Sequence, residues 1–295
     1  MSTDENRWIL VFGATGKQGG STARYLLERG WAVHALVRDP DQPAAKELQA
    51  KGAKLARGDM DDADSLRAAM AGAYGVFSVQ TPLGDAGVPG EERHGKLVAD
   101  IAKETGVEHY VHSSVGGAER PEGVHWRESK LRIEERIREN ALPATFLRPA
   151  YFMENLNIDM FPPTLVGDEL VYRRGLAPGV PLQMISAADN GFFAADAFDD
   201  PQTYIGKNVE LAGDELTGDE IAAVFQRHTG IPTRFESISM EELQETNPWQ
   251  AIAYDWLNRI GYSADIPTLR AQHPDLLTLE EWLSKSGWAP APGDG

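Results

Sequence analysis

The chain has 295 residues, with 45 Asp and Glu against 28 Lys and Arg, a net charge of −17 and no cysteine. This length accommodates one large domain or two modest ones, and the 42% hydrophobic and 25% charged content is typical of a globular protein. Without cysteine, disulfides, thiolate nucleophiles and cysteine-ligated metals are excluded. The acidic balance argues against direct nucleic-acid binding, because phosphate contacts need clustered Lys and Arg.

Neither the N-terminus nor any apolar stretch indicates a membrane. Residues 1–7 are polar and acidic, unlike a signal peptide, and no stretch approaches ~18 uncharged apolar residues. We therefore expect a cytoplasmic protein. Residues 1–150 contain 22 acidic and 20 basic side chains, whereas residues 151–295 contain 23 and 8, a net charge of −15. This asymmetry predicts two domains with different roles, 1–150 and 151–295.

The first half alternates short apolar runs with amphipathic stretches. The predicted strands are Trp8–Phe12, Ala32–Val37, Lys54–Arg57, Gly75–Gln80, Tyr110–Ser114 and Ala144–Arg148. The predicted helices are Lys17–Arg29, Pro43–Lys51, Asp62–Ala71, Glu92–Thr105 and Trp126–Asn140. Strands that alternate with helices at this spacing imply parallel pairing through right-handed crossovers. The fold class is therefore α/β, a Rossmann-type doubly wound parallel sheet.

Beyond Tyr151 the pattern is looser and prolines mark loops. The predicted helices here are Asp189–Phe198, Thr217–Thr229, Glu241–Ile260 and Leu279–Ser286, and the predicted strands are Asn208–Ala212 and Arg234–Ser237. We expect a smaller α+β part that packs over the sheet and does not extend it.

A glycine-rich segment joins the first predicted strand to the first helix. Its sequence, Gly13-Ala14-Thr15-Gly16-Lys17-Gln18-Gly19, has the spacing G-x-x-G-x-x-G. A sharp turn, close approach of the backbone to a pyrophosphate and close helix–strand packing are each easiest without a Cβ. The helix N-terminus adds free N–H groups and partial positive charge for phosphate. The predicted dinucleotide-binding residues are Gly13, Thr15, Gly16, Lys17, Gln18 and Gly19.

The end of the second strand indicates which dinucleotide binds. NAD sites place Asp or Glu there for the ribose 2′-hydroxyl, whereas NADP sites place Arg nearby for the 2′-phosphate. Arg38 occupies this position and Asp39 follows it, which favours NADP(H). After the third strand, the Asp59 carboxylate is suited to accept a hydrogen bond from the adenine amino group, and Met60 to lie against the ring. Asp61 or Asp62 is suited equally to cap the next helix.

Several segments together resemble the NmrA-like family, an atypical branch of the short-chain dehydrogenase/reductase superfamily. They are GATGKQGG at 13–20, Arg38, GDMDD at 58–62, HGKLVADIAKETGVEHYVHSS at 94–114, LRPAYFMENL at 147–156 and VELAGDELTGDEIAAVFQ at 209–226. The resemblance implies a Rossmann domain with NADP(H) in its crevice and a smaller C-terminal domain that covers the substrate cleft. Some such proteins are NADPH-dependent reductases of quinones, enones or other small hydrophobic compounds, and others are NADP(H)-binding regulators or redox sensors.

The wider superfamily uses Tyr-x-x-x-Lys for catalysis, and here the tyrosine position holds Trp126 while Lys130 is present. Indole cannot donate a proton to a developing alkoxide. Trp126, Lys130, Ile133 and Ile137 form one helical stripe, with charged neighbours such as Arg127 off it, so Lys130 should face the carboxyl edge of the sheet. We expect Lys130 to be the catalytic acid/base group, as in the isoflavone-reductase-like relatives, and also to be one of the cofactor-binding residues. The alternative is a lysine whose stem packs on the core and whose charge reaches water.

Further candidates surround this position. Ser113 ends the fifth strand and is suited to hold a substrate carbonyl or to make a strand-end hydrogen bond. Gln80, Thr81 and Pro82 should approach the nicotinamide ribose and pyrophosphate. By resemblance, Pro149, Tyr151 and Phe152 border the nicotinamide, and Ser113, His125, Trp126 and Asn155 form the substrate side. No metal site is expected, because the histidines lack a ligand spacing.

The sequence thus favours an enzyme, an NADPH-dependent oxidoreductase of a small neutral carbonyl, quinone or enone, with Lys130 supplying the proton. The alternative is a non-catalytic NADP(H) redox sensor that acts through protein contacts, which would explain Trp126 and the acidic second half. That half would repel an anionic substrate, so a neutral hydrophobic substrate or a basic protein partner is expected. No pattern indicates an oligomeric state.

Overall fold

The computed structural model describes residues 7–83, 85–157 and 163–290, so the predicted polar N-terminus lies outside these ranges apart from Arg7. The chain forms two compact units. The first contains the chain up to Arg148 together with Ala187–Val209, and the second contains Pro149–Ser186 and the chain from Glu210 onward. This division differs from a boundary at residue 150, because one internal segment of the second half returns to the first unit.

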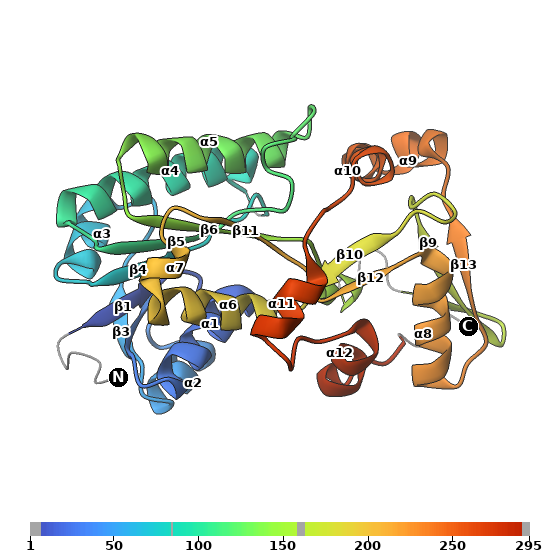
Figure 1. The fold of residues 1–295 in the computed structure, drawn as a ribbon, viewed down its shortest axis with the longest axis horizontal. Helices are drawn as coiled ribbons and strands as arrows, with labels where there is room; N and C mark the ends of the chain where they lie inside the picture. Colours follow the sequence, from blue (N-terminus) through green and yellow to red (C-terminus); the bar gives the residue numbers. More distant parts are fainter. Residues whose placement is uncertain (1–6, 84, 158–162, 291–295) are drawn as a thin grey trace. The chain divides into compact units, whose positions relative to one another are not determined.

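The first unit is built on a seven-stranded parallel sheet (Figure 1). Its strands, in spatial order, are β11 (Asn208–Leu211), β6 (Ala144–Pro149), β5 (His109–Ser113), β4 (Gly75–Ser78), β1 (Trp8–Val11), β2 (Ala32–Val37) and β3 (Lys54–Arg57). Residue Ile9 of β1 pairs with Val33 on one side and with Gly75 on the other. The strand order reverses between β1 and β4, which is where open α/β sheets bind ligands.

Helices cover both faces of this sheet (Figure 1). One face carries α1 (Lys17–Glu28), α2 (Pro43–Ala50) and α6 (Ala187–Asp199), with the short α7 (Pro201–Tyr204) after it, and the other carries α3 (Ala63–Met70), α4 (Gly87–Thr105) and α5 (His125–Glu139). Because both faces are buried, the inner strands β1 and β4 are almost wholly apolar. The predicted Rossmann-type doubly wound sheet is confirmed.

The expectation that the second half does not extend the sheet is wrong. Strand β11 adds to the edge of β6: Phe146 N donates to Lys207 O (2.9 Å), and Gly206 N donates to Ala144 O (2.7 Å). The two strands advance in the same direction, as in the rest of the sheet. The backbone groups at this edge of β6 are thereby satisfied by a segment more than fifty residues away in sequence.

Helix α6 belongs to the first unit because it packs directly on α1. A Cβ at Gly191 would lie only 2.7 Å from Ser21 atoms, so glycine permits the close approach. At the far end, the Asp199 carboxylate accepts hydrogen bonds from Arg29 (2.6 Å) and from the indole of Trp31 (2.8 Å). Spacing along the sequence predicts the helix, but these contacts over more than 165 residues decide where it packs.

The second unit contains two three-stranded sheets. One comprises β12 (Asp214–Leu216), β10 (Leu182–Ile185) and β7 (Tyr151–Phe152), and the other β13 (Thr233–Ser237), β9 (Glu169–Arg174) and β8 (Thr164–Val166). The helical elements are the 3-10 turn η1 (Met153–Asn157), α8 (Gly218–Thr229), α9 (Met240–Thr246), α10 (Pro248–Arg259), α11 (Ile266–Gln272) and α12 (Leu279–Ser286). Across the described ranges, no helix is both long enough and apolar enough to cross a membrane.

The prediction of one helix over Glu241–Ile260 is wrong, because the chain makes two helices there. Asn247 has an extended φ of −153° and separates α9 from α10, and Pro248 is the first residue of α10. The Asn247 side chain accepts a hydrogen bond from Gln250 N (3.1 Å) and caps the second helix. A residue before proline is disfavoured in the α conformation, so the Asn-Pro pair ends the first helix.

Two histidines of β5 are buried in the first unit. Burial lowers the pKa of His109 to about 4, and its Nε2 lies 2.9 Å from the Thr145 hydroxyl. Burial also lowers the pKa of His112 to about 3, with the positive charge of Lys130 acting in the same direction. Both imidazoles are therefore neutral in the folded protein at every pH above 5.

These histidines predict acid sensitivity. Below pH 6.5 these two histidines bind protons in the unfolded chain but stay neutral in the folded protein. Their contribution to the free energy of unfolding is therefore fully present above pH 6.5 and is lost as the pH falls toward the folded pKa values. At pH 5.5 each histidine should lower the free energy of unfolding by about 1 kcal/mol relative to its value above pH 6.5. Urea unfolding of His112→Phe should show a smaller loss between pH 7.5 and pH 5.5 than the wild type. The exposed control His125→Gln should behave as the wild type, and an equal loss in His112→Phe would contradict the assignment.

Candidate functional site

The turn between β1 and α1 has no room for side chains at its glycines. Gly13 has a φ of +60°, and its carbonyl accepts a hydrogen bond from Gly16 N (2.8 Å). A Cβ at Gly19 would lie 2.3 Å from Gly13 O, so α1 passes against the end of β1 at backbone contact. Gly16 provides no side-chain cap to α1, and the first turn holds no acidic residue. The first N–H groups of the helix are thus available to an anion.

The surface around this turn is hollowed. A depression of about 260 Å³ is lined by backbone and side chains of the turn and of α1 and α2, among them Thr15, Gly16, Lys17, Arg24 and Lys51. Gly13, Thr15, Gly16 and Lys17 are exposed, whereas Gly19 is buried. A glycine cradle of this kind fits the pyrophosphate of a dinucleotide, as the sequence motif predicts.

The contact at Gly19 predicts a sharp response to a single methyl group. Gly19→Ala must push α1 away from β1, so its melting temperature should fall by more than about 4 °C. Gly20→Ala is the matched control: a Cβ there would lie 3.1 Å from Ala14 O, a tight contact but a much milder one than at Gly19, and alanine improves the helix propensity, so its melting temperature should fall less. Thermal unfolding followed by circular dichroism measures both. Equal melting temperatures for the two variants would show that the close approach is not limiting.

The ends of β2 and β3 carry the residues predicted for the adenosine half of a dinucleotide. Arg38 is exposed directly after β2 and makes no hydrogen bond or ion pair with any described residue. Asp59 is half-buried, and its carboxylate accepts from Asp61 N (3.0 Å). Met60 lies beside Gln80, with its sulfur 4.0 Å from the amide nitrogen.

The neighbouring acidic residues have separate structural roles. Asp62 caps α3 by accepting from Asp64 N (3.1 Å) and Ser65 N (3.2 Å), as one of the two sequence interpretations predicts. Asp61 is not the cap. Its carboxylate instead pairs with Arg93 (2.7 Å) and His94 (2.8 Å) on α4, and hydrogen bonds from these side chains lower the pKa of Asp61. This pairing ties the turn that carries Asp59 and Met60 to α4.

Ser113 and Gln18, predicted for the substrate and cofactor sides respectively, contact each other. The Ser113 hydroxyl donates to Gln18 Oε1 (2.6 Å), and the Asn190 amide donates to the same oxygen at 3.4 Å. Ser113 is only 1% exposed. The strand-end hydrogen bond is therefore present, and it turns the amide oxygen of Gln18 toward Ser113 and Asn190.

Lys130 forms the most strongly buried charged contact of the predicted site. Its Nζ lies 2.6 Å from Gln80 O, just beyond the carboxyl end of β4, and 2.8 Å from Glu91 Oε1 on α4. The Lys130 side chain is 10% exposed and that of Glu91 is fully buried. The Ser129 hydroxyl donates to the other Glu91 oxygen. Lys130 thus neither extends to solvent nor stands alone.

Glu91 is a site residue that the sequence patterns do not predict. The predicted helix begins at Glu92, five residues too late, whereas α4 begins at Gly87 and includes Glu91 on its buried face. One signal could have identified it: a lysine on an apolar stripe needs a counter-charge, and the adjacent helix supplies carboxylates at this level. A second correction concerns Arg127, which the stripe places off the buried face. It is 4% exposed and donates to Gly116 O.

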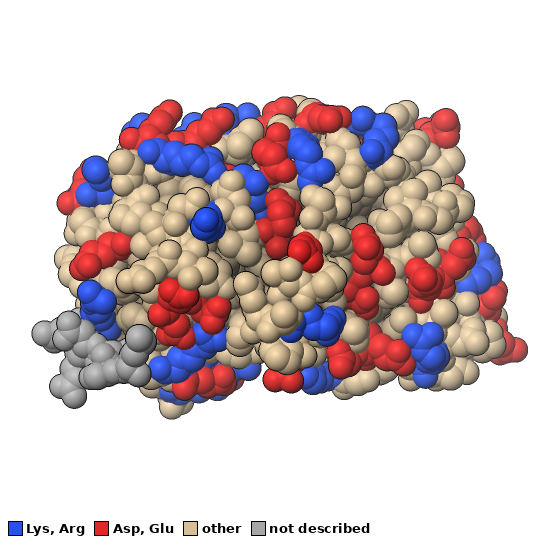
Figure 2. Space-filling view, viewed as in Figure 1, with Lys and Arg blue, Asp and Glu red and all other residues tan. Residues whose placement is uncertain are grey.

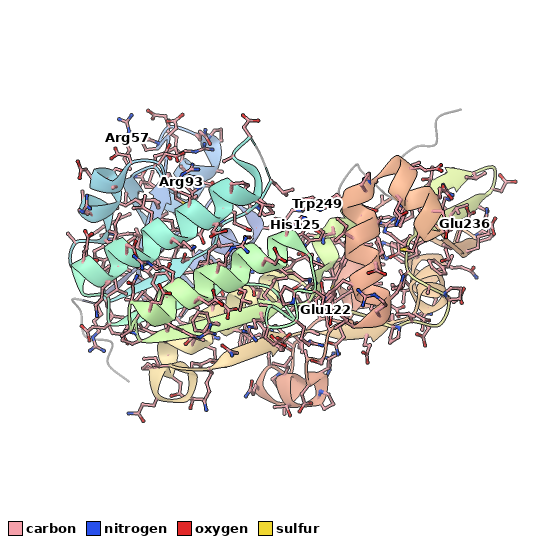
Figure 3. All side chains as sticks on the ribbon, turned by 90° about the horizontal axis from the view of Figure 1, so that it is seen from above. Arg57, Arg93, Glu122, His125, Glu236 and Trp249 are labelled. Atoms are coloured by element: carbon pink, nitrogen blue, oxygen red, sulfur yellow. The ribbon has the colours of Figure 1, made fainter. Side chains whose placement is uncertain are left out.

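The remaining first-unit candidates lie at the surface. Thr81 is exposed and its hydroxyl accepts from Leu83 N (3.2 Å), and Pro82 is half-buried. His125 lies at the start of α5 (Figure 3), with its side chain 66% exposed and its Nδ1 3.6 Å from Glu128. Trp126 follows it and is half-buried.

The last candidates belong to the second unit. Pro149 is buried at the end of β6. Tyr151 and Phe152 form β7 and pair with Met184 and Ile185 of β10. Asn155 is half-buried on η1. Within this unit they form one continuous stretch that leads from β6 through β7 into η1.

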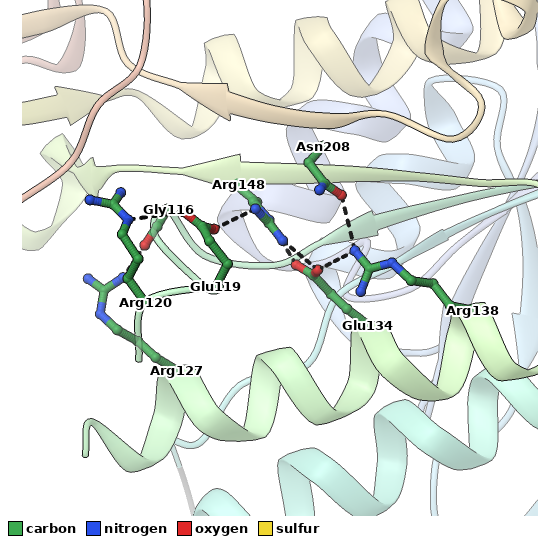
Figure 4. Close-up of polar contacts among 8 residues, drawn as sticks. All are labelled: Gly116, Glu119, Arg120, Arg127, Glu134, Arg138, Arg148 and Asn208. Carbon is green, nitrogen blue, oxygen red and sulfur yellow. Dashed lines mark hydrogen bonds and ion pairs between the residues drawn. The ribbon is translucent and has the colours of Figure 1, made fainter. Parts of the chain in front are cut away.

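A buried ion network holds the loop between β5 and α5 (Figure 4). The carboxylate of Glu134 on α5 accepts from Arg148 on β6 (2.7 and 3.0 Å) and from Arg138 (2.8 Å). Arg148 also donates to Glu119 of the loop (2.6 Å), and Arg138 donates to Asn208 of β11 (3.1 Å). Burial raises the pKa of Glu134, but hydrogen bonds from the two arginines outweigh this effect and hold the pKa below its ordinary value.

Removal of one charge from this network should destabilise the first unit. Glu134→Gln leaves the buried Arg148 guanidinium with less compensation, and the free energy of unfolding should fall by about 3 kcal/mol. Glu135→Gln, on the exposed side of the same helix, should change it by less than about 0.5 kcal/mol. Urea unfolding at pH 7.5 measures both. Similar values for the two variants would mean that the network contributes little.

Within the described ranges, no three or more His, Cys, Asp or Glu side chains are placed to hold a metal ion. On the face drawn in Figure 2, the described Lys and Arg side chains are scattered among Asp and Glu side chains and do not gather in one patch.

Comparison with known proteins gives consistent matches. The model of the NmrA-like family matches residues 5–283. An NmrA-like family domain-containing oxidoreductase of Aspergillus hancockii is 35% identical over 262 residues, which cover 81% of this chain and 78% of that protein.

Solved structures share the fold at lower identity. An NADPH-dependent quinone oxidoreductase of Escherichia coli, complexed with NADPH, superimposes with a TM-score of 0.80 at 22% identity, covering 95% of this chain and 100% of that one. NmrA, a negative transcriptional regulator solved in complex with NADP, gives a TM-score of 0.78 at 22% identity and covers 94% of each chain. At these identities the two structures support the fold alone.

Proposed function

The chain belongs to the NmrA-like family, and we propose that it is an NADPH-dependent reductase of a small neutral quinone, enone or carbonyl compound. The observation that carries this proposal is the uncapped glycine cradle at the start of α1 with Arg38 exposed at the end of the next strand. The cradle suits a pyrophosphate, and a planar guanidinium that pairs with no described side chain suits the 2′-phosphate of NADP(H).

The residues that would hold the cofactor follow from the same edge of the sheet. The backbone of Gly13, Thr15, Gly16, Lys17, Gln18 and Gly19 would bind the pyrophosphate. Asp59 and Met60 would border the adenine, and Gln80, Thr81 and Pro82 would approach the ribose beyond β4. We extend the proposal to Pro149, Tyr151 and Phe152 as neighbours of the nicotinamide. When bound, the cofactor supplies a hydride.

Lys130 is the residue that we place at the reacting end of the site. Its ammonium is bound to the backbone oxygen of Gln80, which belongs to the proposed cofactor-binding set. Ser113 is linked to that set through Gln18, and we propose His125, Trp126 and Asn155 for the substrate side. The surplus of 15 negative charges in residues 151–295 disfavours anionic substrates, so an uncharged hydrophobic acceptor suits this chain.

A second candidate function is supported by one observation. The position of the superfamily's catalytic tyrosine holds Trp126, which cannot donate a proton to an alkoxide. The chain would then be a sensor that binds NADP(H) and contacts a partner protein, and NmrA itself is described as a negative transcriptional regulator. Partner capture in the presence of NADP⁺ or NADPH separates the two functions, because a sensor must discriminate between them.

The reductase proposal predicts NADPH consumption. Absorbance at 340 nm should fall when the protein meets NADPH and at least one acceptor from a set of quinones, enones and aldehydes. Lys130→Ala should lower the rate, because it removes the charged group beside Gln80. Absence of turnover with every acceptor would refute the reductase proposal, and NADPH binding without turnover would favour the sensor.

Arg38 should determine the preference for NADPH over NADH. Hydrogen bonds to a charged group are worth about 1.5–3 kcal/mol, so Arg38→Ala should raise the Kd for NADPH about tenfold to a hundredfold. The Kd for NADH should change by less than about threefold, because NADH lacks the 2′-phosphate. Arg57→Ala is the matched control, since Arg57 is also exposed at the end of a neighbouring strand (Figure 3). Equal weakening of both nucleotides would contradict this role.

A further inference from the structure

We infer that Glu91 is a positioning residue that keeps Lys130 in its charged form, so that Lys130 acts as a fixed cation and does not supply the proton of the reaction. The inference rests on the proposed function and deepens it, because it assigns a residue outside the predicted site and narrows the acceptor class. It departs from the expectation that a lone lysine replaces the missing tyrosine as the acid.

The ammonium of Lys130 lies between a carbonyl and a carboxylate. It donates a hydrogen bond to Gln80 O at 2.6 Å and forms an ion pair with Glu91, whose Oε1 lies 2.8 Å from Nζ. Glu91 is fully buried, and its second oxygen accepts from the Ser129 hydroxyl. Among the described residues Oε1 accepts no hydrogen bond, so the ion pair with Lys130 is what compensates its charge.

This arrangement opposes proton donation by Lys130. If the ammonium lost a proton, Glu91 would remain as a buried carboxylate without a counter-charge, a state of high free energy. The titratable groups that face Lys130 are Glu91 on α4 and His112 on β5, while Glu134 one turn along α5 is bound to Arg148 and Arg138. His112 is neutral at ordinary pH, so Glu91 is the partner that balances the lysine.

A fixed cation favours one kind of hydride acceptor. A quinone that gains a hydride becomes a hydroquinone monoanion, a weak base that is stabilised by a nearby positive charge and takes its proton from water. A simple aldehyde or ketone becomes an alkoxide, a strong base that needs an acid within reach as it forms. Among the acceptors of the proposed function, we therefore expect quinones to be reduced in preference to simple carbonyl compounds.

The first test needs neither cofactor nor turnover. An uncharged amine reacts with acetic anhydride and an ammonium does not, so labelling of Lys130 in the full chain, read by mass spectrometry, reports its protonation. Glu91→Gln should speed this labelling about tenfold at pH 8, because the ammonium loses its counter-charge. The matched control is Glu92→Gln, since Glu92 follows on α4 and pairs with Lys96 (2.6 Å) and Arg132 (2.7 Å). Equal labelling in wild type and Glu91→Gln would overturn the inference.

A double-variant cycle guards against loss of folding. Glu91→Gln and Lys130→Met each leave one buried charge, so each should lower the midpoint of urea unfolding. The combination of the two leaves none and should be more stable than either single variant. If Glu91→Gln alone does not fold, folding of the double variant would support the ion pair between Glu91 and Lys130. Additive losses would overturn it.

The third test measures the rate of turnover in variants of Lys130. Arginine is always charged and cannot donate its proton, so it separates a fixed cation from an acid. With a para-benzoquinone as acceptor, Lys130→Arg should keep about tenfold more activity than Lys130→Met, and the wild-type solvent deuterium isotope effect should be close to one. Equal activities for the two variants, or a large isotope effect, would restore Lys130 as the acid. If the wild type reduces no acceptor, the proposed function fails while the labelling and stability arms still decide the role of Glu91.

Discussion

The contact between the first helix and the end of the first strand is the constraint on which the site depends. Gly19 lies so close to Gly13 O that no side chain fits between them. Helix α1 therefore begins directly at the carboxyl end of β1, with no side-chain cap on its first N–H groups. Strand β1 pairs with β2 on one side and with β4 on the other, so this contact lies at the centre of the sheet, where the strand order reverses.

The helix α5 shows how the fold accommodates charge in a buried layer. Ile133 and Ile137 fill the core as the helical stripe predicts, yet Arg127, Lys130 and Glu134 on the same helix are also buried. Each has a specific partner: a loop carbonyl, a carboxylate of α4 and a guanidinium of β6. Because partners come from three different elements, the helix can occupy only one rotation and one height against the sheet. The charges therefore contribute specificity of packing, whatever their net effect on stability.

Local signals carry most of what the sequence predicts. The predicted bounds of β2, β3 and α12 agree with the structure, and the Rossmann-type sheet and the family are confirmed. Long-range pairing is what the sequence does not reveal. Strand β11 is predicted but its place beside β6 is not, and the short strands β7 and β10 become strands only by pairing with each other and, for β10, with β12. The site follows the same rule: the glycine cradle is local and was predicted, whereas Glu91 gains its importance only where α4 packs on α5.

The return of residues 187–209 to the first unit has a practical consequence for producing parts of this protein. The chain passes between the units after Arg148, after Ser186 and after Val209, so no single cut separates them. A fragment that stops near residue 150 would keep the glycine cradle but lose β11 and α6. It would expose the Phe146 N–H and Ala144 C=O of a naked edge strand and uncover the face of α1 that receives α6. Such an edge recruits other chains, and a truncated nucleotide-binding half would tend to aggregate.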